Sequence, residues 1–210
     1  MNPSTPYRYG VFLRPDPTTC ALLAQLHLLM KQQYGLVSCA AFPPHATLAG
    51  SMHTLADPTE VADRVGEALR GTRQFTVYNS GFEQGTQGVS YNVHDLPDGT
   101  VNRPMADLIL TAHKAFDGIS LPPDHFPFID IEPAEFRAHL SVVAHEMLLR
   151  PDLLPEVTEF VERLGWQPPA SFTAETVSLF RFHSPDWQGH WWTTLTWEHV
   201  RSWTLETAAG

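Results

Sequence analysis

Two short segments of this sequence each place a histidine two residues before a hydroxyl-bearing side chain. The segments are PHATLAG, which contains His45 and Thr47, and AHLSVVA, which contains His139 and Ser141. In a β-strand, side chains two residues apart project from the same face, so each histidine would share a face with its hydroxyl. An imidazole can give or take a proton near neutral pH, and a hydroxyl can donate a hydrogen bond to an anionic oxygen. The two pairs therefore predict general acid–base chemistry on an anionic substrate in a wet cleft.

The His-x-Ser/Thr motif is short enough to occur by chance, so the evidence for function lies in the segments that contain it. With 11 His, and with 30 Ser and Thr among 210 residues, chance alone gives roughly 1.6 matches to His-x-Ser/Thr. Both matches lie in apolar, strand-like segments, and one falls in each half of the chain. A paired catalytic role is one hypothesis that follows, and two unrelated structural histidines are the other.

The segments around these motifs alternate between predicted strands and predicted helices. Asp-Pro pairs at 16–17 and 57–58 are typical of helix starts, and the glycines at 35, 71 and 165 indicate helix ends. We expect helices over 17–34, 58–70, 103–116 and 155–164, and strands over 7–14, 36–42, 45–50, 75–82, 89–93, 136–145, 172–182 and 191–205. Segments 75–82 and 89–93 are predicted to form a hairpin, and 119–133 a loop. This order predicts an α+β protein with antiparallel sheets and two similar halves.

The composition bounds the class of protein and of partner. The chain is 43% hydrophobic and carries 13 Lys and Arg against 23 Asp and Glu, a formal net charge of −10. Such a chain folds into a soluble globular protein, and strong binding to a long nucleic acid is disfavoured. No signal peptide and no membrane span is predicted, so we expect a cytoplasmic protein. Cys20 and Cys39 are expected as reduced thiols, although sequence alone leaves their pairing open.

The segments HATLAG and HLSVVA resemble the paired H-x-[ST]-x-hydrophobic signatures of the 2H phosphoesterase superfamily. That group includes 2′-5′ RNA ligase-like proteins and cyclic phosphodiesterases. The resemblance implies a bilobal α+β fold with two pseudo-symmetric lobes, whose antiparallel sheets and flanking helices surround a central cleft. It implies one domain over 1–210, with approximate lobes 1–100 and 101–210 that can exchange strands. It also implies metal-independent, cofactor-free chemistry, with His45, Thr47, His139 and Ser141 as catalytic residues.

This resemblance predicts an enzyme that hydrolyses a small cyclic phosphate, such as a nucleoside 2′,3′-cyclic phosphate. One imidazole would act as base and the other as acid, and the sequence does not assign the two roles. An RNA-end processing or 2′-5′ ligating enzyme could use the same four residues, and short RNA ends remain possible substrates. Members near the bacterial RNA ligase-like branch often carry Arg where this chain has Ala144, which points away from that branch's substrate. A non-catalytic module that binds cyclic nucleotides or a protein is an alternative of another class.

Other side chains are candidates for contacting the substrate. Arg137 lies two residues before the second motif histidine and could clamp a phosphate, whereas a surface ion pair is its structural alternative. Arg181 alternates out of an apolar strand and has the same two interpretations. Tyr7, Tyr9 and Phe42 could stack on a base, with core packing as the alternative. The remaining histidines show no metal-ligand spacing, so no metal site is predicted.

Overall fold

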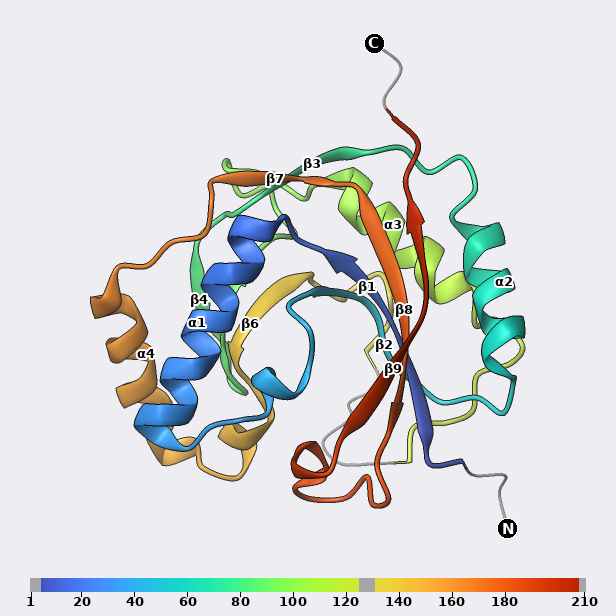
Figure 1. Ribbon diagram of the computed structural model, residues 1–210. Coiled ribbons are helices and arrows are strands. Elements are labelled where there is room, and N and C mark those ends of the chain that lie inside the picture. The colour runs from blue at the N-terminus through green and yellow to red at the C-terminus, as the bar shows by residue number, and fades with distance from the viewer. Residues whose placement is uncertain (1–4, 125–130, 208–210) are drawn as a thin grey trace.

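The computed structural model describes residues 5–124 and 131–207, and in them nine strands form three antiparallel sheets beside four α-helices (Figure 1). All the strand pairs are antiparallel, as expected for an α+β protein. The four-stranded sheet has the order β2 (Ala46–Met52), β1 (Tyr7–Arg14), β8 (Thr176–His183), β9 (Thr196–Thr204). The three-stranded sheet has the order β4 (Phe82–Gln84), β5 (Val89–Asn92), β6 (His139–Val143). The two-stranded sheet joins β3 (Phe75–Tyr78) to β7 (Ser171–Ala174). Together, the helices and the three antiparallel sheets confirm the predicted α+β class.

The helices begin and end where local side chains satisfy their free backbone groups. Asp16 accepts a hydrogen bond from the third residue of the first helix, and Asp57 caps the second in the same way. Gly35 and Gly165 end the first and last helices in the left-handed conformation, at φ 71° and 62°. These helices are α1 (Pro17–Tyr34), α2 (Pro58–Ala68), α3 (Arg103–Lys114) and α4 (Leu154–Leu164). All four predicted helices are confirmed, to within a few residues at their ends.

Each sheet takes strands from both halves of the chain. In the four-stranded sheet, β1 and β2 pair with the late strands β8 and β9, and in the three-stranded sheet β4 and β5 pair with β6. Strand β2 is an edge of the first sheet and β6 an edge of the second, and these two edges approach each other (Figure 1). The two histidine segments, far apart in sequence, are therefore carried on adjacent strands.

Two hydrophobic clusters lie on opposite faces of the four-stranded sheet. The odd-numbered side chains of β1, such as Val11 and Leu13, pack into the main core with α2 and α3 nearby, while α1 covers β6. Phe12 points the other way, into a smaller aromatic cluster with Phe180 and Phe182 and with Trp187, Trp191 and Trp192. This aromatic face is the one that the motif of β2 shares. No helix in the described part of the chain is both long and apolar enough to span a membrane.

Several predicted strands are shorter or differently paired than expected. Segment 75–82 is two strands, because Gly81 turns the chain at φ 116°; β4 then pairs with β5, while β3 leaves to pair with β7. The predicted hairpin of 75–82 with 89–93 is thus correct only for its last part. The predicted strand 36–42 is wrong, since this segment contains a 3-10 turn at Cys39–Ala41. In the loop predicted for 119–133, the described residues form no helix or strand, and 125–130 lie outside the described residues.

The ends of the late predicted strands also differ. Segment 136–145 is a strand only over β6, and a 3-10 turn follows at His145–Leu148. Segment 172–182 divides into β7 and β8, which belong to different sheets, and segment 191–205 opens with a 3-10 turn at Trp191–Thr193 before β9. Apolar composition marked these segments as extended, but it did not mark the bends between them.

Candidate active site

His45 is the residue immediately before β2, and it lies against an aromatic ring of the neighbouring strand. Its imidazole stacks on Phe12, with ring centroids 3.8 Å apart and planes inclined by 18°. Thr47 pairs with Phe12 in the ladder, while Ala46 and Leu48 are completely buried on the opposite face. The two-residue alternation expected for this motif is therefore present, and it leaves both polar side chains partly accessible.

His139 is the first residue of β6, and its motif shows the same alternation. Leu140 and Val142 are buried, whereas His139 and Ser141 are partly exposed. Behind the strand, His27 of α1 is buried and its Nε2 lies 2.9 Å from the carbonyl oxygen of Ser141. Because a carbonyl only accepts, this ring nitrogen is the donor, and the bond ties α1 to the backbone of the motif.

The two motif histidines are held by the same type of hydrogen bond. Nδ1 of His45 lies 2.7 Å from the carbonyl oxygen of Pro43, and Nδ1 of His139 lies 2.9 Å from that of Arg137. In both cases the partner is two residues upstream, and since a carbonyl can only accept, Nδ1 must carry the hydrogen. Nε2 is then the ring nitrogen that can exchange a proton with a substrate, and the tautomer is fixed by the backbone.

Burial lowers the pKa of His45 to about 4, although the hydrogen bond to Pro43 opposes this effect. The neighbouring imidazoles of His139, His27 and His145 lower the pKa of His45 further, because each would repel a second positive charge. His45 is therefore neutral at pH 7, with a lone pair on Nε2. A neutral imidazole is the form that a general base requires.

An aromatic wall continues from His45 towards a third imidazole. The ring of Phe42 lies 5.8 Å from that of His45 and 6.4 Å from that of His145. His145 in turn lies 4.8 Å from the buried ring of Trp191. The structure thus brings Phe42, a candidate from the sequence, beside His45. His145 was not among the predicted site residues, since its position depends on the turn after β6, which no local pattern indicated.

Two of the predicted substrate contacts lie on the other side of the sheet. Tyr9 and Arg181 face each other in the β1–β8 ladder, on the face opposite to Phe12 and so away from His45. The hydroxyl of Tyr9 donates to the carbonyl oxygen of Ala56 at 3.2 Å. Arg181 forms an ion pair with Glu198 at 2.6 Å and lies over the ring of Tyr7. The structure therefore does not bring Tyr7, Tyr9 or Arg181 to the two motif histidines.

Arg137 is close to the site but its side chain has a protein partner. The guanidinium forms an ion pair with the buried carboxylate of Asp95, at the end of the three-stranded sheet. This is the structural alternative that the sequence offered for Arg137. Its backbone carbonyl, rather than its charge, is the group that contacts His139.

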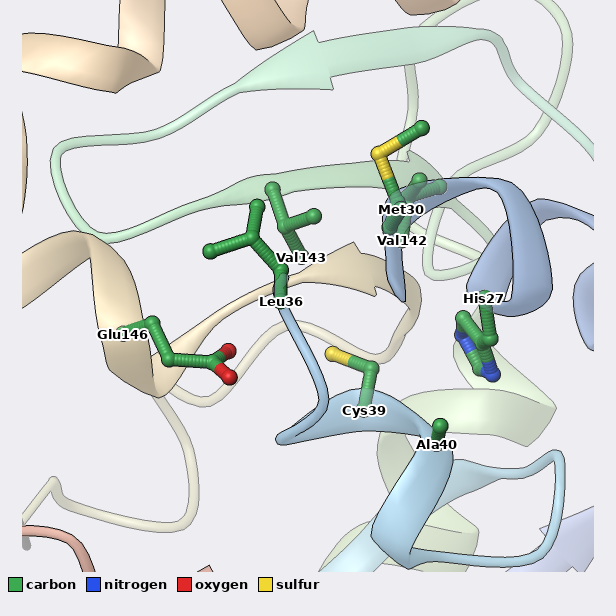
Figure 2. A pocket seen from close by; sticks show the side chains of 8 residues that line it. All are labelled: His27, Met30, Leu36, Cys39, Ala40, Val142, Val143 and Glu146. Atoms are coloured by element: carbon green, nitrogen blue, oxygen red, sulfur yellow. The ribbon is translucent and has the colours of Figure 1, made fainter. Parts of the chain in front are cut away.

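A small, tightly packed pocket lies beside β6 and is lined in part by Val142 and Val143 (Figure 2). Glu146 projects into it, and its carboxylate accepts hydrogen bonds from the backbone N–H of Val37 at 2.5 Å and of Ser38 at 2.9 Å. Burial raises the pKa of the Cys39 thiol in this pocket to about 12, with the nearby Glu146 adding to the effect. The pocket supports the loop before β2 and holds neither motif histidine; its lining is His27, Met30, Leu36, Cys39, Ala40, Val142, Val143 and Glu146.

Cys20 and Cys39 are both free thiols. Among the described residues, no group of three or more His, Cys, Asp or Glu side chains is arranged to hold a metal ion.

Solved structures share this fold over nearly the whole chain. A structure described as a phosphoesterase aligns with a TM-score of 0.54 at 14% identity, over 96% of this chain and 99% of that one. E. coli LigT complexed with 3′-AMP aligns with a TM-score of 0.52 at 13% identity, again over 96% and 99%. E. coli LigT complexed with NADP+ aligns with a TM-score of 0.51 at 15% identity, over 97% and 99%. The resemblance expected from the two motifs is thereby confirmed at the level of the fold.

The likeness is one of structure and not of sequence. No family model matches the sequence, and no curated protein matches it significantly.

Proposed function

We propose that this chain is a phosphoesterase that opens a small cyclic phosphate of the nucleoside 2′,3′-cyclic phosphate class. The observation that carries this proposal is the matched pair of histidines on adjacent edge strands. Each has Nδ1 bonded to the carbonyl two residues upstream, and each is followed by a hydroxyl on the same strand face. The proposed reaction requires these two imidazoles to lie on opposite sides of one phosphorus atom.

In the proposed reaction, His45 is the general base and His139 the general acid. Nε2 of neutral His45 takes a proton from water while the water oxygen forms a bond to phosphorus. The bond between phosphorus and one ribose oxygen breaks, and protonated His139 gives its proton to that leaving oxygen. The products are a phosphate monoester and a free ribose hydroxyl, so atoms and charges balance. Thr47 and Ser141 would donate hydrogen bonds to the non-bridging oxygens, where charge shifts in the transition state.

The charges of the chain favour a small substrate over a long RNA. A protein that follows a nucleic-acid backbone needs available cationic side chains along its groove. Six arginines of the described residues are instead engaged with carboxylates: Arg8, Arg70, Arg137, Arg163, Arg181 and Arg201. A cyclic nucleotide presents a single negative charge, and Phe42 beside His45 offers a surface on which its base could stack. That E. coli LigT has been solved with 3′-AMP and with ATP is consistent with a nucleotide ligand.

The test is a turnover assay on the full chain with EDTA present. The substrates are the nucleoside 2′,3′-cyclic phosphates and short 2′-5′-linked oligonucleotides. We expect hydrolysis of the cyclic phosphates, and a loss of roughly 10²-fold or more in kcat for His45→Ala and for His139→Ala. His183→Ala is the matched control, because its ring packs on Tyr7 on the other face of the sheet.

Each other outcome contradicts part of the proposal. Unchanged turnover in either folded variant would eliminate the paired-histidine mechanism. Activity that EDTA abolishes would show a metal-dependent reaction. Turnover or joining of the oligonucleotides alone would assign the chain to RNA-end processing or 2′-5′ ligation. The position of the phosphate in the product, 2′ or 3′, would identify the bond that breaks.

A further inference from the structure

The two motif histidines share one hydrogen-bond pattern, but the carbonyls that hold them are fixed by different means. On the His45 side, the accepting carbonyl belongs to Pro43 and is followed by Pro44. Proline locks φ, and it also restricts the residue before it, so this carbonyl is held by the covalent chain. On the His139 side, the carbonyl belongs to Arg137, which has no proline beside it. Some other contact must fix its direction.

One such contact is an ion pair between the exposed guanidinium of Arg137 and a buried carboxylate. The side chain of Arg137 is 53% exposed, whereas that of its partner Asp95 is only 6% exposed. The same carboxylate oxygen of Asp95 accepts a hydrogen bond from Nδ2 of Asn92 at 2.8 Å. Asn92 is the residue opposite His139 in the β5–β6 ladder. Asp95 therefore links the side chain of Arg137 to the strand that pairs with His139.

The backbone of residues 137–139 is held by the same short segment. The N–H of Val93 donates to the carbonyl of Ala138 at 3.3 Å, and the N–H of Ala138 donates to Nδ1 of His94 at 3.4 Å. Oδ1 of Asn92 in turn accepts from the N–H groups of His94 and Asp95, which closes the turn on itself. Segment 92–95 thus binds the N–H of the same peptide group whose carbonyl orients His139.

Burying the carboxylate of Asp95 costs folding free energy that an apolar residue at this place would not cost. Within the described residues, Oδ1 of Asp95 is buried and has no hydrogen-bond partner. A buried carboxylate that is only partly compensated opposes folding, and an apolar residue at such a place is often equally stable or better. The buried charge of Asp95 is explained if this carboxylate holds a neighbouring catalytic group in the geometry that the reaction requires.

We propose that Asp95 is a positioning residue for His139. Through its ion pair with Arg137 and its bond to Asn92, it fixes the direction of the Arg137 carbonyl. That carbonyl then holds the hydrogen of His139 on Nδ1 and directs Nε2 towards the substrate. Arg137 acts in this account through its backbone and its tie to Asp95, and not as a phosphate clamp. The kinetic consequences rest on the proposed function, whereas the tautomer of His139 does not.

The experiment compares Asp95→Asn and Arg137→Gln with Asp63→Asn. Asp63 is also the acidic partner of an arginine, Arg201, but this pair is exposed and joins α2 to β9, neither of which carries a motif. On a nucleoside 2′,3′-cyclic phosphate, we expect Asp95→Asn and Arg137→Gln each to lower kcat about 10-fold or more with little change in KM, since a small misplacement of an acid–base group has this effect. The double variant should be no worse than either single one. Asp63→Asn should behave as the unaltered chain.

A second readout does not depend on activity. Nitrogen-15 spectra of the histidine rings, recorded at alkaline pH so that the rings are uncharged, distinguish hydrogen on Nδ1 from hydrogen on Nε2. In Asp95→Asn and Arg137→Gln, the ring of His139 should change from one tautomer to a mixture, while His45 should keep the hydrogen on Nδ1 as the internal control. If the unaltered chain turns over no cyclic phosphate, the proposed function fails, and these spectra still decide the role of Asp95.

Two results would overturn the inference. One is an unchanged His139 spectrum in both variants. The other is a rise in KM with unchanged kcat for Arg137→Gln, which would show that the guanidinium binds the phosphate directly. Should Asp95→Asn fail to fold, Arg137→Gln decides alone, because that side chain is largely exposed.

Discussion

The pKa of His45 sets the acidic limit of the proposed activity. An ordinary histidine has a pKa near 6.5, and burial against the surrounding rings lowers that of His45 to about 4. A general base works only in its neutral form, so kcat/KM should hold constant well below pH 6 and fall only as the pH approaches 4. The limb for kcat should lie at higher pH, because the negative charge of a bound phosphate diester favours the protonated imidazole.

Replacing Phe12 tests the physical cause of this shift. In Phe12→Leu, the ring that stacks on His45 at 3.8 Å is removed, while an apolar side chain still packs against Phe180 and Phe182. Water would then reach the face of the imidazole, and the acidic limb of kcat/KM should move up towards pH 6.5. The largest possible movement is the difference between 6.5 and about 4, or about 2.5 pH units, which corresponds to at most about 3.4 kcal/mol.

The measurement is kcat/KM for a nucleoside 2′,3′-cyclic phosphate between about pH 3 and 9, with the fold checked by circular dichroism at each end. A proton NMR titration of the His45 ring gives the same pKa without substrate. Phe180→Leu is the matched control, because it removes a ring of the same cluster whose centroid lies 5.9 Å from Phe12 and leaves the stacked pair in place. A limb near pH 6.5 in the unaltered chain, or a limb that Phe12→Leu does not move, would refute the assignment of His45 as a base held neutral by burial.

Three further results are expected. Thr47→Val and Ser141→Ala should each lower kcat by roughly 10²-fold in steady-state assays, because each removes a donor to the transition-state oxygens; a change in KM alone would contradict this role. Glu146→Ala should lower the free energy of unfolding by about 2–4 kcal/mol in urea denaturation, since three buried donors of Val37 and Ser38 lose their acceptor. Gly88→Ala should lower the free energy of unfolding by roughly 1–3 kcal/mol, because the new Cβ would lie 2.2 Å from the carbonyl oxygen of Val143 in β6. Unchanged stability of the Glu146 or the Gly88 variant would show that the backbone around it relaxes freely.

Local signals predicted the helices well and the strand partners poorly. Asp16, Asp57 and Gly165 act within a few residues of themselves, so the ends that they set can be read from the sequence. The partner of β3 cannot, since its pairing with β7 joins segments far apart in the chain. The turn-forming residues Asn79, Ser80 and Gly81 divide segment 75–82, and the positive φ of Gly81 lies between β3 and β4, which belong to different sheets.

The candidate site shows the same division between local and distant causes. The two-residue period of a strand was enough to place Thr47 with His45 and Ser141 with His139. It could not say which face of β1 and β8 meets the site, and the sequence therefore offered Tyr9 and Arg181, which lie on the other face. The stacking of Phe12 and the link from Asp95 also join distant segments, so no motif could indicate them.

The difference between the two histidines arises outside their motifs. A reaction that needs both a base and an acid is helped when the surroundings of two imidazoles make one hold its proton less tightly than the other. The Nδ1 hydrogen bonds are alike, but His45 is enclosed by the rings of Phe12 and Phe42, which favour its neutral form. By contrast, the residue two positions before His139 is Arg137, whose side chain is exposed and forms an ion pair. In the proposed reaction, the neighbours that the fold supplies would therefore set the two roles, and exchanging the motif sequences HAT and HLS should leave the base on the β2 side.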